Sequence, residues 1–261
     1  MLRYTRGMFM VTLVRAPASL DGAAASLGAR QGISAYEART RLAGDFPRVV
    51  AVLGERAPAE AQAAGLRADG LSAAVLDGAA VASDRQRDVA ASLAFGAGAV
   101  VATMRDGRTR EVAYGSVGLL IHGVRTGVAT STEESTVKSF SAGRAILTGG
   151  LSMRSSKTVT TTKSTEQRET FVYVIERGVE PALAVYERGM NYAFLGAALA
   201  PSSMANFTTV LTRLRERCAA ARYDQRLTRP GGFGLLPLCP PGKDPAAWKS
   251  DIAAALVALE P

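Results

Sequence analysis

Apolar runs and helical patterns alternate through the N-terminal third of the chain. The β-branched and apolar run Met8–Val14 predicts a buried strand that stops at Arg15. The alanine-rich stretch Ser19–Arg30 favours a helix. The remaining expected elements are a helix beginning at Ser34, a strand at 48–53, a helix from Pro58 to Gly70 and a strand at 71–76. The pattern therefore predicts the order β-α-α-β-α-β.

The start of the second expected helix carries the sharpest local signal. In Ser34-Ala35-Tyr36-Glu37, the Ser34 hydroxyl can accept a hydrogen bond from the Glu37 amide, while the Glu37 carboxylate reaches back to the Ser34 amide. Ala38 and Leu42 continue the apolar face of this helix, and Gly44 is expected to end it. The tetrapeptide thus predicts a capping box.

A different pattern begins near residue 85, where short apolar runs follow one another without helical spacing. Asp106-Gly107 between two of these runs is typical of a tight hairpin turn, because glycine adopts positive φ without strain. The expected strands are 89–95, 99–104, 111–114, 117–124, 170–176, 182–187 and 190–195.

One amphipathic helix is expected after these strands. It opens at Pro201-Ser202-Ser203, and its apolar residues recur at helical spacing, at Phe207, Val210, Leu211, Leu214 and Cys218. About seven strands with one such helix describe a small barrel or sandwich plugged at one end. We therefore expect the α+β class: a small β-α-α-β-α-β domain at 8–78, then a β barrel with a C-terminal capping helix at 85–227.

The last segment, 228–261, is expected to be a linker and a tail helix. Residues 230–245 are rich in glycine and proline, which is typical of a linker. Trp248, Ile252, Leu256 and Leu259 then fall on one helical face. This face either docks back onto a domain or presents a surface to a partner.

A serine- and threonine-rich insert, 126–170, interrupts the second domain. Seventeen of the 36 residues from Thr130 to Thr165 are Ser or Thr, and the stretch from Lys138 to Thr165 contains no acidic residue. The five basic residues from Lys138 to Thr165 are the candidate anion- or partner-binding residues: Lys138, Arg144, Arg154, Lys157 and Lys163. One interpretation is a solvated loop or a long twisted hairpin, since KTVTTTK has high strand propensity. The other is an element that faces phosphates, acidic lipid or an acidic partner, with hydroxyls that phosphorylation could make negative.

The charge balance agrees with an anionic partner. Thirty-one Lys and Arg against 23 Asp and Glu give a net charge of +8, which favours nucleic acid, anionic lipid or an acidic protein, although arginine-rich composition alone also produces it. The two cysteines cannot form a disulfide framework, and no apolar run is long enough to span a membrane. The N-terminal apolar stretch is too short for a signal peptide. These features predict a cytoplasmic protein, with a peripheral membrane location as the further option.

The sequence contains few side chains suited to catalysis. His122 is the only histidine, so any triad would need it, yet it lies within an expected strand and we interpret it as structural or pH-sensing. One histidine and two distant cysteines cannot form a zinc site. Gly96-Ala97-Gly98 is expected in a loop between strands and lacks the helix that a dinucleotide site requires. We therefore expect no enzyme, no metal and no cofactor.

Three stretches of residues 8–77 carry a family likeness: FMVTLVRA, GISAYEARTRLAGDFPRVVA and APAEAQAAGLRADGLSAAVLD. In their element order, the glycine before the short helix and the Glu37-Ala38 pair, they resemble the C-terminal domain of the bacterial ribosomal stalk protein. That family recruits translation factors through basic residues around its second helix. This chain has Tyr36 at a usual lysine position and keeps a basic residue at Arg39. The resemblance implies the fold alone.

A second likeness lies in the block AVVATMRDGRTREVAYGSVGLLIHGVR and in the helix SSMANFTTVLTRLRERCA. Through the pattern of these segments, rather than an invariant motif, residues 85–227 resemble the pleckstrin-homology-like domains of bacteria. In such domains a basic loop between strands binds anionic head groups, which implies the same for the insert. Together these observations predict a non-enzymatic interaction module or adaptor that binds a protein partner, with an anionic membrane surface as a further partner. The alternative is a basic factor associated with nucleic acid or the ribosome.

Overall fold

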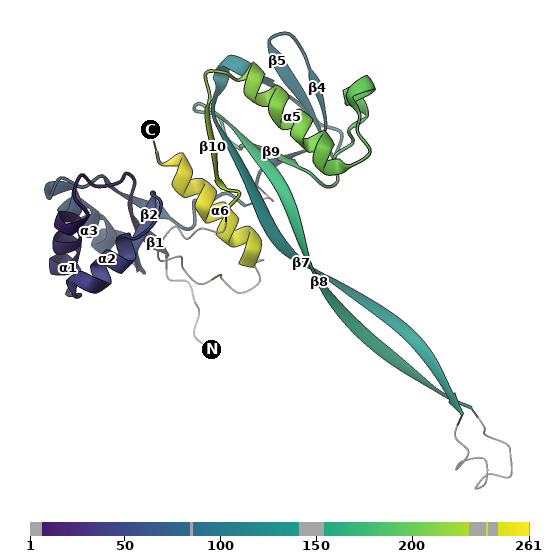
Figure 1. Cartoon of the computed structure of the whole chain (residues 1–261), viewed down its shortest axis with the longest axis horizontal. Helices are drawn as coiled ribbons and strands as arrows, with labels where there is room; N and C mark the ends of the chain where they lie inside the picture. Colours follow the sequence, from purple (N-terminus) through teal and green to yellow (C-terminus); the bar gives the residue numbers. More distant parts are fainter. Residues whose placement is uncertain (1–6, 84–85, 141–153, 230–238, 240–244, 261) are drawn as a thin grey trace, which may run out of the picture. The chain divides into compact units, whose positions relative to one another are not determined.

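The structure is a computed structural model that describes residues 7–83, 86–140, 154–229, 239 and 245–260. For 126–140, 154–167 and 245–246 it describes the backbone alone. The chain mixes helices and strands and divides into a larger unit, residues 1–125 and 169–261, and a smaller one, Thr126–Arg168 (Figure 1).

The N-terminal part of the larger unit contains a three-stranded antiparallel sheet. Its strands β1 (Phe9–Leu13), β2 (Arg48–Leu53) and β3 (Ala73–Asp77) lie in the order β2-β1-β3. The helices are α1 (Leu20–Gln31), α2 (Ala35–Leu42) and α3 (Arg56–Ala68). The predicted order β-α-α-β-α-β is the observed one. Its core is formed by Val11, Leu13, Leu27, Leu42, Val50 and Leu66 with small alanines between them.

The described strands after residue 86 form a seven-stranded sheet, in the order β10-β7-β8-β9-β4-β5-β6. Their bounds are β4 (Asp88–Phe95), β5 (Ala99–Met104), β6 (Thr109–Ala113), β7 (Val117–Phe140), β8 (Arg154–Glu176), β9 (Leu183–Tyr186) and β10 (Arg222–Leu227). The predicted closed barrel is wrong, because the sheet ends at β10 on one side and at β6 on the other and does not close. The predicted capping helix is α5 (Ser203–Arg217).

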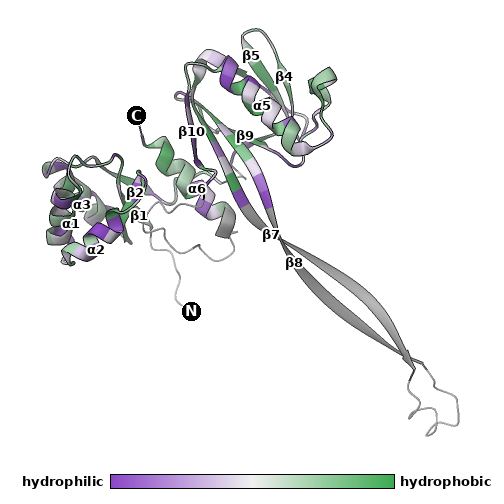
Figure 2. Cartoon of the chain, in the orientation of Figure 1, coloured by the Kyte–Doolittle hydropathy of each residue, from purple (hydrophilic) through white to green (hydrophobic). Residues whose placement is uncertain are grey.

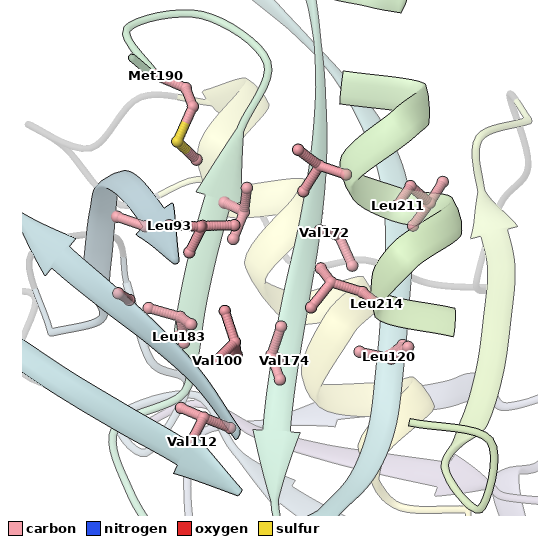
Figure 3. Packing of buried hydrophobic residues seen from close by; sticks show 14 of the residues in the cluster. Leu93, Val100, Val112, Leu120, Val172, Val174, Leu183, Met190, Leu211 and Leu214 are labelled. Atoms are coloured by element: carbon pink, nitrogen blue, oxygen red, sulfur yellow. The ribbon is translucent and has the colours of Figure 1, made fainter. Parts of the chain in front are cut away.

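The two faces of this sheet carry two separate apolar layers. Leu120, Val172, Val174 and Leu183 pack against Phe207, Val210, Leu211 and Leu214 of α5, and Figure 3 shows the labelled members of this layer. The alternate residues Leu119, Ile121, Phe171 and Tyr173 pack with α6 (Pro245–Ala258) and with Met10 and Val49. This alternation follows from the two-residue period of a strand. The predicted apolar stripe of α5 is confirmed, since all five of its residues are buried.

The tail helix docks back onto the sheet, which was the first of its two predicted roles. Trp248, Ile252 and Leu256 are buried in the layer that also contains Phe171 and Tyr173. Hydrophobic residues predominate along the part of α6 coloured in Figure 2. The Arg222 guanidinium holds the end of the helix, since it donates to the Val257 carbonyl at 2.7 Å and pairs with the Glu260 carboxylate.

Two elements differ from expectation. The strand predicted at 190–195 is not formed. The described residues there include the 3-10 helix η2 (Ala193–Ala198), and Gly189 and Gly196, directly before and after the predicted segment, have positive φ. The strand β10 was not predicted. It pairs in parallel with β7, through partners such as Tyr223 and Leu120. A short 3-10 turn, η1 (Tyr114–Ser116), joins β6 to β7.

Candidate functional site

The predicted basic residues lie in a two-stranded ribbon. β7 and β8 are neighbours in the sheet order and run from the larger unit into Thr126–Arg168, where Figure 1 shows them as a long twisted hairpin. Lys138 lies in β7, and Arg154, Lys157 and Lys163 lie in β8. Arg144 lies outside the described residues. The backbone therefore favours the hairpin over the solvated loop for the described part of the insert.

The outer edges of this ribbon have no neighbouring strand in the described part of the chain. β10 pairs with β7 only as far as Gly123, and β9 pairs with β8 only from Phe171 onward. Beyond these points each ribbon strand has the other as its only partner in the sheet order. Every second residue of such an edge turns its backbone N–H and C=O outward, which makes the edge a template for a further strand.

A clasp of side chains closes the base of the ribbon within the larger unit. The Arg125 guanidinium on β7 donates to the Glu169 carboxylate on β8 at 2.7 and 3.0 Å. The same guanidinium lies 4.0 Å from the ring centroid of Tyr186 on β9. This half-buried pair fixes β7 beside β8 at the point where they leave the sheet.

His122 lies on the α5 side of β7. Its Nδ1 and the Tyr223 hydroxyl are 2.8 Å apart and share a hydrogen bond, and its ring stacks on that of Tyr223. Burial, and then the positive charge of Arg215, lower the pKa of His122 below its ordinary value, so the imidazole is neutral at pH 7. In the described part of the larger unit no acidic group bonds to this imidazole, so it has no triad geometry.

The cavities that described residues of the larger unit line include the following three. One of about 510 Å³ lies beside α6 and is lined by alanines, Ile175, Val179 and the buried Arg87. A second of about 440 Å³ lies between α5, β7 and β10. A third of about 510 Å³ lies in the N-terminal part, where Arg30 and Arg41 line it but already pair with Asp69 and Glu37.

Groups suited to covalent or metal chemistry are sparse among the described residues. No three His, Cys, Asp or Glu side chains there come together as metal ligands. The Cys218 thiol is 2% exposed, and burial raises its pKa, which keeps it protonated. Among the described helices, none has the length and apolar character needed to cross a bilayer.

Sequence reasoning missed the side chains that converge at the second cavity. Leu120, Arg215 and Tyr223 come from a strand, a helix and a later strand. The one sequence feature that could have indicated this cavity is the pattern of alternate arginines near the end of α5. No protein-family model, curated protein or solved structure matches the chain.

Proposed function

We propose that this protein is a non-enzymatic interaction module whose ribbon, Thr126–Arg168, binds an extended acidic segment of a partner protein by strand addition. The observation that supports it is the pair of open β edges, which continue past Gly123 on β7 and before Phe171 on β8. Main-chain hydrogen bonds to such an edge supply affinity, and side chains along it supply specificity.

The sequence of the ribbon supports an acidic partner. Lys138, Arg154, Lys157 and Lys163 fall on its described strands, and no acidic residue lies between Lys138 and Thr165. Cations along an edge steer an acidic chain toward it and repel a second copy of the same ribbon. The ribbon sequence is polar at both alternating sets of strand positions, and a two-stranded ribbon of such composition is stabilised by pairing with a further strand.

In a competing explanation, the lysines protect the protein against aggregation and bind no partner. Lysine on an exposed edge also prevents edge-to-edge aggregation without any partner. The two explanations differ in what a charge reversal does. Partner binding requires Lys157→Glu with Lys163→Glu to abolish capture of the partner, whereas protection alone requires it to leave capture intact and change self-association.

The test compares the intact chain with a variant in which Asn-Gly replaces 126–168 and joins Arg125 to Glu169. The side-chain pair between these two residues places the strands close enough for a two-residue turn. We expect partners captured from a cell extract by the intact chain to be lost by this variant and by the double charge reversal. Cross-linking with mass spectrometry should place the partner's contact on β7 or β8.

Arg15→Glu with Arg229→Glu is the matched control, since both residues are exposed and the change in net charge is the same. The control should keep the partners. Capture that survives removal of the ribbon contradicts the proposal. Binding to anionic vesicles or to single-stranded nucleic acid that depends on Lys157 and Lys163, with no protein captured, replaces the partner class with one of those anions.

We also propose the two finer fold assignments, a stalk-like domain and a pleckstrin-like domain. The antiparallel order β2-β1-β3 with three helices supports a stalk-like domain at 8–78. Consecutive strands followed by α5 support the pleckstrin-like resemblance of 85–227, with an open sheet in place of the family's barrel. A solved structure of each segment, compared with those families, tests both assignments.

A further inference from the structure

The cavity between α5, β7 and β10 combines an apolar floor with charged groups. Its volume is about 440 Å³, within the range of roughly 300–1,000 Å³ in which proteins hold small molecules. The accessible apolar lining is formed by Ala219 and Ala221, which follow α5, and by the Tyr223 ring, whereas the lining residues Leu120 of β7 and Cys218 are only 1% and 2% exposed. Arg215 and Glu216, at the end of α5, supply the charges.

Within the described part of the protein, the Arg215 guanidinium has no hydrogen-bond or ion-pair partner. Its guanidinium lies 4.2 Å from the ring centroid of Tyr223, and it makes no hydrogen bond or ion pair with any described residue. Elsewhere in the larger unit, arginines such as Arg110 and Arg226 are paired with carboxylates. Stacking on a ring fixes a guanidinium while its N–H donors stay in the plane, ready for a carboxylate.

Glu216 is likewise without an ion pair among the described residues, although Arg215 precedes it. Neighbouring positions on a helix do not face one another, so the two charges do not neutralise each other by contact. The last turn of α5 adds a partial negative charge of roughly half an elementary unit from its carbonyl groups. A simple anion would meet this negative end and Glu216, so the charges fit a ligand that carries both signs.

We propose that this cavity binds a free amino acid with a compact apolar side chain. The carboxylate of the ligand meets Arg215, its ammonium meets Glu216 and the carbonyl end of α5, and its side chain lies against Ala219, Ala221 and the Tyr223 ring. The Tyr223 ring, held by the hydrogen bond of its hydroxyl to His122, forms the wall beneath the guanidinium. This proposal does not depend on the ribbon.

The test uses L-leucine as the probe and His122 as the reporter. Because the chain contains one histidine, its imidazole gives a single set of NMR signals, next to Tyr223. Titration with L-leucine should move these signals to saturation. N-acetyl-leucine lacks the ammonium, leucinamide lacks the carboxylate and glycine lacks the apolar side chain, and each should bind at least about tenfold more weakly.

Substitutions at Arg215 and Glu216 test which side chain binds the carboxylate of the ligand and which binds its ammonium. Arg215→Gln should remove the preference for leucine over leucinamide, and Glu216→Gln should remove the preference for leucine over N-acetyl-leucine. Arg213→Gln is the matched control, because Arg213 lies over Phe95 of β4 and does not line this cavity, and it should change neither preference.

Three results overturn the proposal. The first is no saturable shift with L-leucine up to about 10 mM, well above a millimolar dissociation constant. The second is equal binding of leucine, its two blocked forms and glycine. The third is leucine binding with unchanged preferences in both Arg215→Gln and Glu216→Gln. All variants change exposed or half-buried side chains, and a thermal unfolding curve for each verifies that it is folded.

Discussion

Arg87 and Asp251, which are 164 positions apart in the chain, form an ion pair whose side chains are 5% and 6% exposed. Arg87 precedes β4, and Asp251 lies in α6. The guanidinium also donates to the Ala82 carbonyl at 2.7 Å and lies 4.1 Å from the ring centroid of Tyr173. The pair therefore ties the tail helix to the start of the seven-stranded sheet.

Breaking this pair on one side should be costly. Asp251→Asn removes a buried carboxylate charge that faces the buried Arg87 guanidinium, and we expect a loss of about 3–5 kcal/mol in the free energy of unfolding. Replacing both partners, by Arg87→Met with Asp251→Leu, should cost less than either single change, because both charges of this buried pair are then removed together. Urea unfolding of the four proteins in this cycle measures the difference. A double variant no more stable than the singles would contradict this account.

Asp69 should titrate well below an ordinary aspartate. Arg30 binds its carboxylate through Nε and Nη2, at 2.6 and 2.7 Å, and Ser26 donates to the same group. The hydrogen bond from Arg30 and then that from Ser26 lower the pKa of Asp69 to about 2. Since the folded-state pKa is the lower one, the stabilisation is present above the ordinary pKa of 3.8 and is lost as the pH falls through about 2.

Arg30→Gln tests that assignment. It should move the pKa of Asp69 back toward 3.8, measured by NMR titration of the carboxyl carbon, and flatten the acid dependence of stability between about pH 4 and 2. Arg39→Gln is the control, because Arg39 pairs with Asp21 instead. An unchanged pKa for Asp69 in Arg30→Gln would show that the guanidinium is not the cause.

The sequence predicted those elements whose side chains show a clear period. The strands at 48–53 and 99–104 have the observed bounds, because their apolar runs end at turn residues. β10 was missed because RYDQRL has no apolar alternation. Its charged residues are used in pairs, with Arg222 and Arg226 bonded to Glu260 and Arg226 also bonded to Asp224.

The two candidate sites, the ribbon and the cavity beside Arg215, also differ in how far the sequence could predict them. The basic composition of the ribbon is a local property, so the sequence could indicate it, and the structure places Lys138, Arg154, Lys157 and Lys163 on strands. The cavity beside Arg215 depends on β10 lying next to β7, a parallel pairing between residues about a hundred positions apart. Local periodicity carries no information about such a pairing.

Truncation of the α5 stripe should be among the most damaging changes to the sheet domain. Leu214 is fully buried against Leu120 and Val172, so Leu214→Ala removes apolar contact and leaves a cavity, at a cost of about 2–5 kcal/mol. Thr208→Ala on the exposed side of the same helix is the control, expected within about 0.5 kcal/mol of the wild type. Equal losses for the two variants would mean that α5 does not pack as described.

The predicted capping box is half formed, and its two halves should behave differently. The Ser34 hydroxyl accepts from the Glu37 amide at 3.1 Å, as expected, but the Glu37 carboxylate bonds to Arg41 at 2.7 Å instead of to the Ser34 amide.

Ser34→Ala should therefore cost about 1 kcal/mol, because an amide at the start of α2 loses its acceptor. Glu37→Gln should cost about 0.3–0.5 kcal/mol, the size of an exposed pair one helical turn apart. Ser34→Gly also removes the hydroxyl, but glycine is itself tolerated at the N-cap position, so this variant should lose only a few tenths of a kcal/mol. A larger loss for Glu37→Gln than for Ser34→Ala, measured by urea unfolding, would mean that the carboxylate, and not the hydroxyl, holds the start of this helix.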